Sequence, residues 1–151
     1  MIDRIRRVTR NTLLYPSFME DYVLYMMALA SHTMSAEFHA IIRQHGLRVP
    51  EWRILATLAS YEPQSVTQLC AKVLYDQPRL TKTIAKMEEA GLVERRQHEG
   101  DRRVVLVTLT GRGRELVAGL IALAREHELR ALKNLTGAER KQLKKILRKL
   151  V

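Results

Sequence analysis

The spacing of apolar residues predicts a mostly helical chain that begins with a long helix over residues 17–45. Pro16 and Ser17 mark its start, and Glu20 follows Ser17 at the spacing of a capping box. Gly46 stands where a helix commonly ends. Small and apolar residues recur at helical spacing within it: Tyr22, Met26, Leu29, Thr33, Ala36, Phe38, Ile41 and Ile42.

Two shorter helices are predicted to follow. The first begins at Pro50, which suits a first helical turn, and ends at Glu62 and Pro63. Its expected buried face consists of Trp52, Leu55, Leu58 and Ala59. The next helix is capped by either Ser65 or Thr67, and its inward residues are Leu69 and Val73.

A fourth helix and a β-hairpin come next. Asp76 caps the helix, Pro78 is tolerated in its first turn, and Gly91 ends it. Its core residues are Leu80, Ile84 and Met87. The apolar period then falls to two in residues 93–96 and 104–109, which are predicted as strands. The polar, glycine-containing residues between them predict a hairpin with a long basic tip.

Two helices complete the expected fold. Thr110 caps a long helix that continues to about Leu135, and Thr136 with Glu139 forms a capping box for the last helix. The inward residues expected in the long helix are Leu116, Leu120, Leu123, His127 and Leu132.

The charge of this 151-residue chain is unevenly distributed. The formal net charge is +10, which favours a polyanionic partner. Residues 1–16 and 65–103 are moderately basic, residues 17–64 are slightly acidic, and residues 104–151 carry eleven basic against four acidic side chains. Much of this excess lies in residues 140–149, which we interpret as the solvated face of an amphipathic helix; contact with a phosphate backbone is the alternative.

Several functional classes are disfavoured by the composition. The single Cys70 argues against a disulfide framework or a Cys-rich zinc site and fits a reducing compartment. The longest apolar run, residues 22–30, is too short for a membrane span, and Glu20 and Asp21 precede it where a signal peptide would be basic. We therefore expect a cytoplasmic protein that does not associate with membranes. No catalytic or nucleotide-binding motif is present, so we expect neither an enzyme nor a cofactor.

Metal binding is not expected either. A metal site would need further acidic or thiol ligands close to a histidine, and Glu126 and Glu128 beside His127 point away from it on a helix. We therefore interpret the five histidines as buried or interfacial residues. They are His32, His39, His45, His98 and His127.

Three short helices followed by a hairpin are typical of a winged helix-turn-helix. In this fold one helix enters the major groove of DNA, where base edges differ in their donors and acceptors. A basic hairpin tip can reach the minor groove, whose negative potential favours arginine. The fourth helix offers Gln77, Arg79, Thr81, Lys82 and Lys86, and the hairpin tip offers Arg102 and Arg103.

Residues 101–113, with the sequence DRRVVLVTLTGRG, resemble the wing signature of the MarR family of bacterial transcriptional regulators. Residues 87–93 (MEEAGLV), 46–55 (GLRVPEWRIL) and 135–139 (LTGAE) match further segments of that family in the same order. The resemblance covers roughly residues 20–150.

The resemblance implies a mostly α fold with a small β-hairpin wing and with N- and C-terminal dimerisation helices. The expected parts are a basic arm over 1–16, a dimerisation helix over 17–45, a DNA-binding lobe over 46–110 and C-terminal dimerisation helices over 111–151. The implied function is that of a homodimeric regulator, most often a repressor, on a pseudo-palindromic double-stranded DNA site.

The family also implies roles for single residues. Arg103 matches the arginine that enters the minor groove, and Asp101 matches the carboxylate that orients it, although Asp101 could only cap the turn. Lys82 stands where the family often has arginine, so a phosphate contact is favoured over a bidentate base contact. Ser65 and Thr67 could cap or bind phosphate, and Lys86 and Arg96 could bind phosphate or be solvated. The full set of expected DNA contacts is Ser65, Thr67, Gln77, Arg79, Thr81, Lys82, Lys86, Arg96, Asp101, Arg102 and Arg103.

A small aromatic or amphipathic effector is the switch that the resemblance implies. The residues expected to border its crevice are Tyr25, His32, Arg43, Trp52 and Arg53. Some members of the family sense oxidants through a cysteine, but Cys70 lies in the third helix, where a small buried thiol is the preferred interpretation. The alternatives are a non-switched architectural DNA-binding protein, a cysteine-based redox-sensing regulator, and an interaction module that no longer binds DNA.

Overall fold

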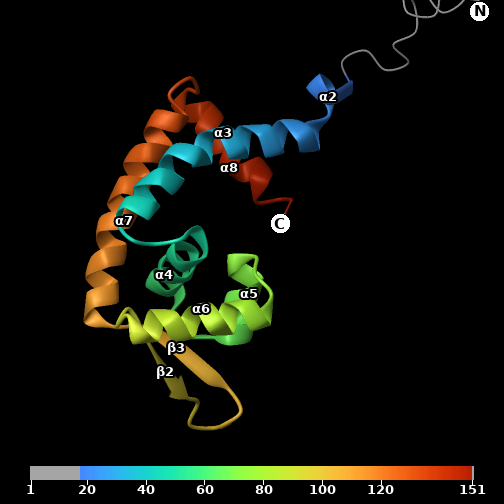
Figure 1. Ribbon diagram of the computed structural model, residues 1–151. Helices are drawn as coiled ribbons and strands as arrows, with labels where there is room; N and C mark the ends of the chain where they lie inside the picture. Colours follow the sequence, from blue (N-terminus) through green and yellow to red (C-terminus); the bar gives the residue numbers. More distant parts are fainter. Residues whose placement is uncertain (1–17, 151) are drawn as a thin grey trace, which may run out of the picture. The chain divides into compact units, whose positions relative to one another are not determined.

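The computed structural model describes residues 18–150, so the predicted basic arm over 1–16 and the predicted start at Ser17 lie outside the described residues (Figure 1). The fold is mostly helical with one small sheet, as predicted. The helices are α2 (Phe18–Asp21), α3 (Val23–Gln44), α4 (Val49–Tyr61), α5 (Val66–Val73), α6 (Gln77–Glu89), α7 (Gly111–Ala131) and α8 (Gly137–Leu147). The strands are β1 (Gln64–Ser65), β2 (Val93–Gln97) and β3 (Val105–Leu109). The chain divides into two compact units, with the boundary between Ala36 and Glu37.

The helix predicted over 17–45 is observed in two pieces, α2 and α3, separated by Tyr22. Helical hydrogen bonds continue past this point: the backbone N–H of Tyr22 donates to Phe18 and that of Met26 donates to Tyr22. Gly46 follows α3 with a φ of +74°, the left-handed conformation that glycine adopts without strain. The predicted C-terminal end of the helix is therefore confirmed.

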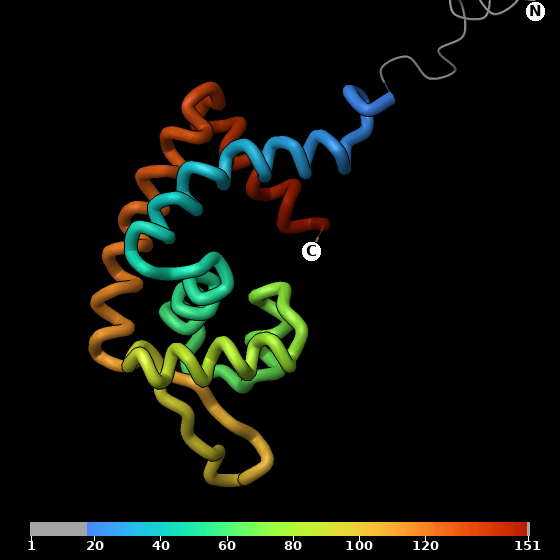
Figure 2. Tube along the Cα trace, in the orientation of Figure 1, coloured from blue at the N-terminus to red at the C-terminus, as the bar shows by residue number. Residues whose placement is uncertain are grey.

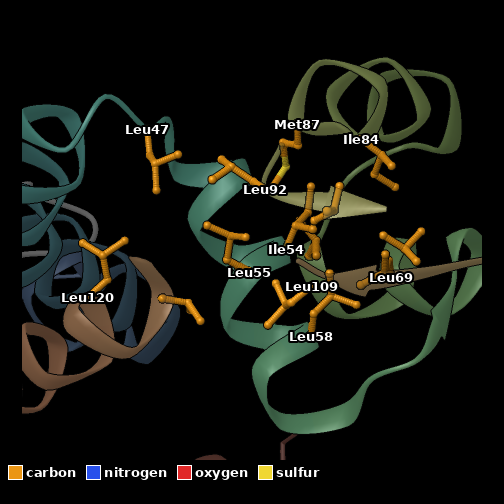
Figure 3. Close-up of a cluster of buried hydrophobic side chains, with 14 of the residues drawn as sticks. Leu47, Ile54, Leu55, Leu58, Leu69, Ile84, Met87, Leu92, Leu109 and Leu120 are labelled. Atoms are coloured by element: carbon orange, nitrogen blue, oxygen red, sulfur yellow. The ribbon is translucent and has the colours of Figure 1, made fainter. Parts of the chain in front are cut away.

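The core of the second unit is built from α4, α5, α6 and β3, with further side chains from the end of α3, from β2 and from α7 (Figure 3). Leu69, Val73, Leu80, Ile84 and Met87 are buried as predicted. The prediction that Ala59 is buried was wrong, because α4 turns the face of Ile54, Leu55 and Leu58 into the core and leaves Ala59 exposed. Burying the larger isoleucine removes more apolar area from water than burying the alanine would.

The caps of α5 and α6 fix where both helices begin. Ser65, and not Thr67, is the N-cap of α5: its hydroxyl accepts the N–H of Gln68, and the side chain of Gln68 accepts the N–H of Ser65 in return. The carboxylate of Asp76 accepts the N–H of Arg79 at 3.0 Å, which confirms Asp76 as the cap of α6.

The sheet has three strands in the order β1-β3-β2, all antiparallel. The predicted hairpin is β2 and β3, with Val93 opposite Leu109 and Gln97 opposite Val105. The two-residue strand β1 was not predicted, because it is too short to show alternation. Its pairing of Ser65 with Leu106 joins the start of α5 directly to the wing. Figures 1 and 2 show the hairpin projecting beyond α6.

The long helix α7 packs on α4 and ends at Ala131, four residues before the predicted end. Leu132 caps it, and the N–H of Leu135 donates back to Leu132 in a turn. Of the predicted inward residues, Leu120 and His127 are buried, and Leu116, Leu123 and Leu132 are half-buried. Thr136 and Glu139 form the predicted capping box at the start of α8. Across residues 18–150, no helix has both the length and the apolar character that a membrane crossing requires.

Candidate nucleic-acid interface

The start of α5, the first turns of α6 and the first part of β3 surround one open depression of about 280 Å³. Its lining is made of Ser65, Val66, Thr67, Gln77, Thr81, Arg103, Val104 and Val105. Five of these eight residues are among the DNA contacts predicted from the sequence. The fold thus brings together, on one surface, residues that lie up to 38 positions apart in the chain.

The buried face of α6 determines which side chains the helix offers to a ligand. Leu80, Ile84 and Met87 enter the core together with Thr83, whose hydroxyl donates to the carbonyl of Arg79. The remaining faces carry the predicted polar set, all of it exposed: Gln77, Arg79, Thr81, Lys82 and Lys86. A helix with donors at its start and cations further along suits a groove lined by bases and phosphates.

These polar residues differ in how they are held. The guanidinium of Arg79 lies 3.3 Å from the carboxylate of Asp76, which restrains it at the start of α6. The hydroxyl of Thr81 donates to the carbonyl of Gln77 at 2.9 Å, so its oxygen stays available as an acceptor. The side-chain ammonium of Lys82 makes no hydrogen bond or ion pair with any residue from 18 to 150.

Asp101 holds Arg103 at the wing. One carboxylate oxygen of Asp101 accepts the backbone N–H of Arg103 at 3.0 Å and lies 3.4 Å from its side-chain Nε. Asp101 therefore caps the turn and in the same conformation pairs with the side chain of Arg103. The Arg103 side chain is 94% exposed, which leaves its terminal nitrogens open to a ligand.

Two other arginines of the hairpin, Arg95 and Arg96, form ion pairs with glutamates. Arg96, a predicted DNA contact, pairs with Glu94 at 2.7 Å but remains largely exposed. Arg95 bonds the carboxylate of Glu88 through its side chain and its backbone N–H, and the side-chain bond is the main reason why the pKa of Glu88 is below its usual value. Arg95 thus fastens β2 to the end of α6.

Glu62 anchors the base of the wing, a role that the sequence analysis missed. Its carboxylate accepts the N–H of Leu109 at 2.9 Å and pairs with the guanidinium of Arg114. Burial raises the pKa of this carboxyl, but the bonds from Leu109 and Arg114 outweigh that effect and leave the pKa below its usual value. No sequence signal marks the role, since the partners are 47 and 52 positions away.

The residues predicted to border the effector crevice are divided between the two compact units. Tyr25 and His32 lie in the first unit, and the other three lie in the second. Trp52 packs edge-on against Phe38, with ring centroids 5.3 Å apart. Arg53 donates to the backbone carbonyl of Val73 at the end of α5.

No group of three or more His, Cys, Asp or Glu side chains within residues 18–150 could hold a metal ion. His127 is buried against Phe38, whereas His32, His45 and His98 are exposed within this chain. Cys70 is half-buried against the core.

Comparison with known proteins identifies similar chains. The model of the MarR family matches residues 47–105. The crystal structure of a MarR family transcriptional regulator from Silicibacter pomeroyi is 43% identical, with a TM-score of 0.78, and the match covers 89% of this chain and 96% of that one. BpsR from Bordetella bronchiseptica, whose DNA binding is regulated by 6-hydroxynicotinic acid, is 26% identical with a TM-score of 0.79, and the match covers 90% and 97%. The transcriptional repressor IacR from Pseudomonas putida is 27% identical over 85% of this chain and 77% of its own length.

Proposed function

Because the chain belongs to the MarR family of transcriptional regulators, we propose that it represses transcription by binding a specific pseudo-palindromic DNA site as a homodimer. The observation that carries this proposal is the shared depression in which α5, α6 and the wing present five expected DNA contacts. Binding at this surface requires no catalytic chemistry.

The helix α6 is assigned to the major groove. Gln77, Arg79 and Thr81, in its first turns, are assigned to base edges, since the first residues of a recognition helix make these contacts. Lys82 and Lys86 carry charges that are assigned to phosphates, as a lysine ammonium gives attraction without bidentate geometry.

The wing and the start of α5 complete the contact. Arg103 is assigned to the minor groove, and its pairing with Asp101 lowers the cost of ordering the guanidinium on binding. Arg96 and Arg102 are assigned to the phosphates beside it. Thr67, exposed in the first turn of α5, is assigned to a phosphate, whereas the hydroxyl of Ser65 already accepts the N–H of Gln68.

The apolar surface of the first unit supports a homodimer. A groove of about 620 Å³ runs along α3 and is lined by Met19, Glu20, Tyr25, Met26, Leu29, Ala30, Thr33 and Met34. Large apolar side chains are exposed at nine positions between 18 and 29: Phe18, Met19, Tyr22, Val23, Leu24, Tyr25, Met26, Met27 and Leu29. Monomeric proteins rarely leave such a contiguous patch in water. We assign residues 17–45 and 111–151 to dimerisation and 46–110 to DNA binding, with the two lobes facing successive grooves.

A small aromatic or amphipathic acid is the proposed effector. BpsR supports this class, because 6-hydroxynicotinic acid regulates its DNA binding. In this chain Tyr25, His32, Arg43, Trp52 and Arg53 are the proposed contacts. A ligand that binds one spacing of the two lobes more tightly would shift the dimer away from the spacing that fits DNA.

Selection from a library of random 30-base-pair duplexes tests this function. The proposal predicts enrichment of one pseudo-palindromic sequence, bound at least about a thousandfold more tightly than unselected duplex. The logarithm of the affinity should fall with the logarithm of the salt concentration with a slope of roughly −5 to −9. Equal binding of all duplexes would indicate a non-switched architectural DNA-binding protein. No binding to any duplex would indicate an interaction module that no longer binds DNA.

A further inference from the structure

The tip of the wing is folded around the side chain of His98. The ring nitrogen Nδ1 accepts the backbone N–H of Gly100 at 3.0 Å and that of Asp101 at 3.3 Å. The backbone closes the same loop, since the N–H of His98 donates to the carbonyl of Val104 and the N–H of Val104 donates to the carbonyl of Asp101. The loop between β2 and β3 is therefore fixed around its own histidine.

Building on the proposed function, we propose that His98 is a positioning residue for DNA binding. Its Nδ1 fixes the backbone of Asp101, and the carboxylate of Asp101 in turn holds Arg103. Arg103 is almost fully exposed, and no other side chain from residues 18–150 pairs with it. The order of the groove-reading guanidinium thus depends on a ring five positions earlier in the chain.

The donors also define the tautomer of His98. Backbone N–H groups can only donate, so Nδ1 carries no proton, and the proton of the neutral ring is on Nε2. The loop requires a hydrogen-bond acceptor at the position of Nδ1, where the N–H groups of Gly100 and Asp101 point. Asparagine can supply one from the same distance along its side chain, whereas alanine cannot.

A direct contact between His98 and DNA is the competing explanation, and two comparisons separate it from positioning. First, a direct contact through Nε2 would be lost in His98→Asn as fully as in His98→Ala, whereas positioning through Nδ1 would be retained in His98→Asn. Second, if His98 contacts DNA directly, removing its side chain should weaken binding whether or not Arg103 is present. Positioning acts through Arg103, so the loss should vanish once Arg103 is removed.

The binding experiment uses the tightest duplex that the wild-type protein selects from the random 30-base-pair library, with fluorescence anisotropy at constant salt and pH. We expect His98→Ala to bind roughly five- to tenfold more weakly and His98→Asn to stay within about twofold of wild type. In the Arg103→Ala background, His98→Ala should change the affinity by less than about twofold. Two results would overturn the proposal: wild-type affinity in His98→Ala, or the same fold loss of affinity from His98→Ala in the Arg103→Ala background as in the wild-type background.

A second measurement needs no DNA and separates this inference from the proposed function. Amide hydrogen exchange followed by NMR should be roughly tenfold faster at Gly100 and Asp101 in His98→Ala than in the wild type or in His98→Asn. Unchanged exchange would contradict the positioning role even if DNA binds. Protected amides in a wild-type protein that selects no duplex would overturn the proposed function and leave the loop geometry standing.

Discussion

The carboxylate of Glu62, just beyond the end of α4, accepts a 2.9 Å hydrogen bond from the backbone N–H of Leu109 at the end of β3. The same carboxylate pairs with Arg114 in the first turn of α7. One half-buried side chain therefore joins the base of the wing to the helix before it and the helix after it.

Replacing Glu62 by glutamine should lower the free energy of unfolding by about 1–3 kcal/mol near pH 7, because the charge-assisted bonds are lost while the shape is kept. The pKa of Glu62 is depressed in the folded protein, so its contribution is present above the unfolded-state pKa. The contribution is lost as the pH falls through the lower folded-state pKa. Urea denaturation should thus show a difference in the free energy of unfolding between wild type and E62Q near neutral pH. The difference should begin to shrink as the pH falls below the ordinary glutamate pKa of about 4.3 and should be lost below the folded-state pKa. A difference in stability that grows on acidification would show that the pKa of Glu62 is raised, not lowered, by folding.

Replacing Lys82 by alanine should weaken binding to all duplexes alike, because a phosphate contact carries no sequence information. The slope of log affinity against log salt should become less steep by about one unit. Lys145→Ala is the matched control: Lys145 is exposed on α8 in the basic run that we interpret as solvated, and its loss should leave affinity and slope unchanged. A large loss in Lys145→Ala would instead show that α8 follows the phosphate backbone, and a change in sequence preference in Lys82→Ala would place Lys82 on a base.

Replacing Leu24 by glutamate should disrupt the homodimer, since Leu24 is 61% exposed and is one of the nine exposed apolar residues between positions 18 and 29. A charge in an apolar interface loses its hydration without gaining a partner. Sedimentation equilibrium should show a monomer at concentrations at which the wild type is a dimer. Leu74→Asn is the control, because Leu74 is even more exposed, at 77%, but lies between α5 and α6. A wild-type monomer, or a dimer retained in L24E, would refute the assignment of α3 to dimerisation.

Local signals predicted most of the fold. Asp76, Thr110 and Thr136 cap the helices that the sequence assigned to them, because a cap needs only its neighbours three residues away. Gly91 has a φ of +69° at the predicted end of α6, where other residues would be strained. The errors arose where tertiary packing decides: β1 exists only because β3 offers it a partner, and Ala59 is exposed because α4 presents Ile54 instead.

In the candidate site, too, contacts between residues close in the sequence could be predicted, and contacts that depend on tertiary structure could not. The pairing of Asp101 with Arg103 could be predicted, because the two residues are separated by one position and resemble a known wing. The bond from Leu109 to Glu62 could not be predicted, since it spans 47 positions. His98 was grouped with the other histidines, because its role depends on a loop conformation that brings two amides to one ring nitrogen. Trp52 and Arg53 were predicted as effector contacts only from their position along the chain. In the structure Trp52 packs against Phe38, and Arg53 donates to the carbonyl of Val73.

The affinity of Arg103→Ala for the selected duplex tests the central claim most directly. Removing a minor-groove guanidinium should cost about 1–3 kcal/mol, roughly five- to 150-fold in affinity, without changing the thermal stability of the protein. The matched control is Arg125→Ala, which removes the same charge from an exposed position on α7. This variant should bind the duplex within about twofold of the wild-type affinity. Equal affinities for wild type and Arg103→Ala, with both proteins folded, would contradict the account.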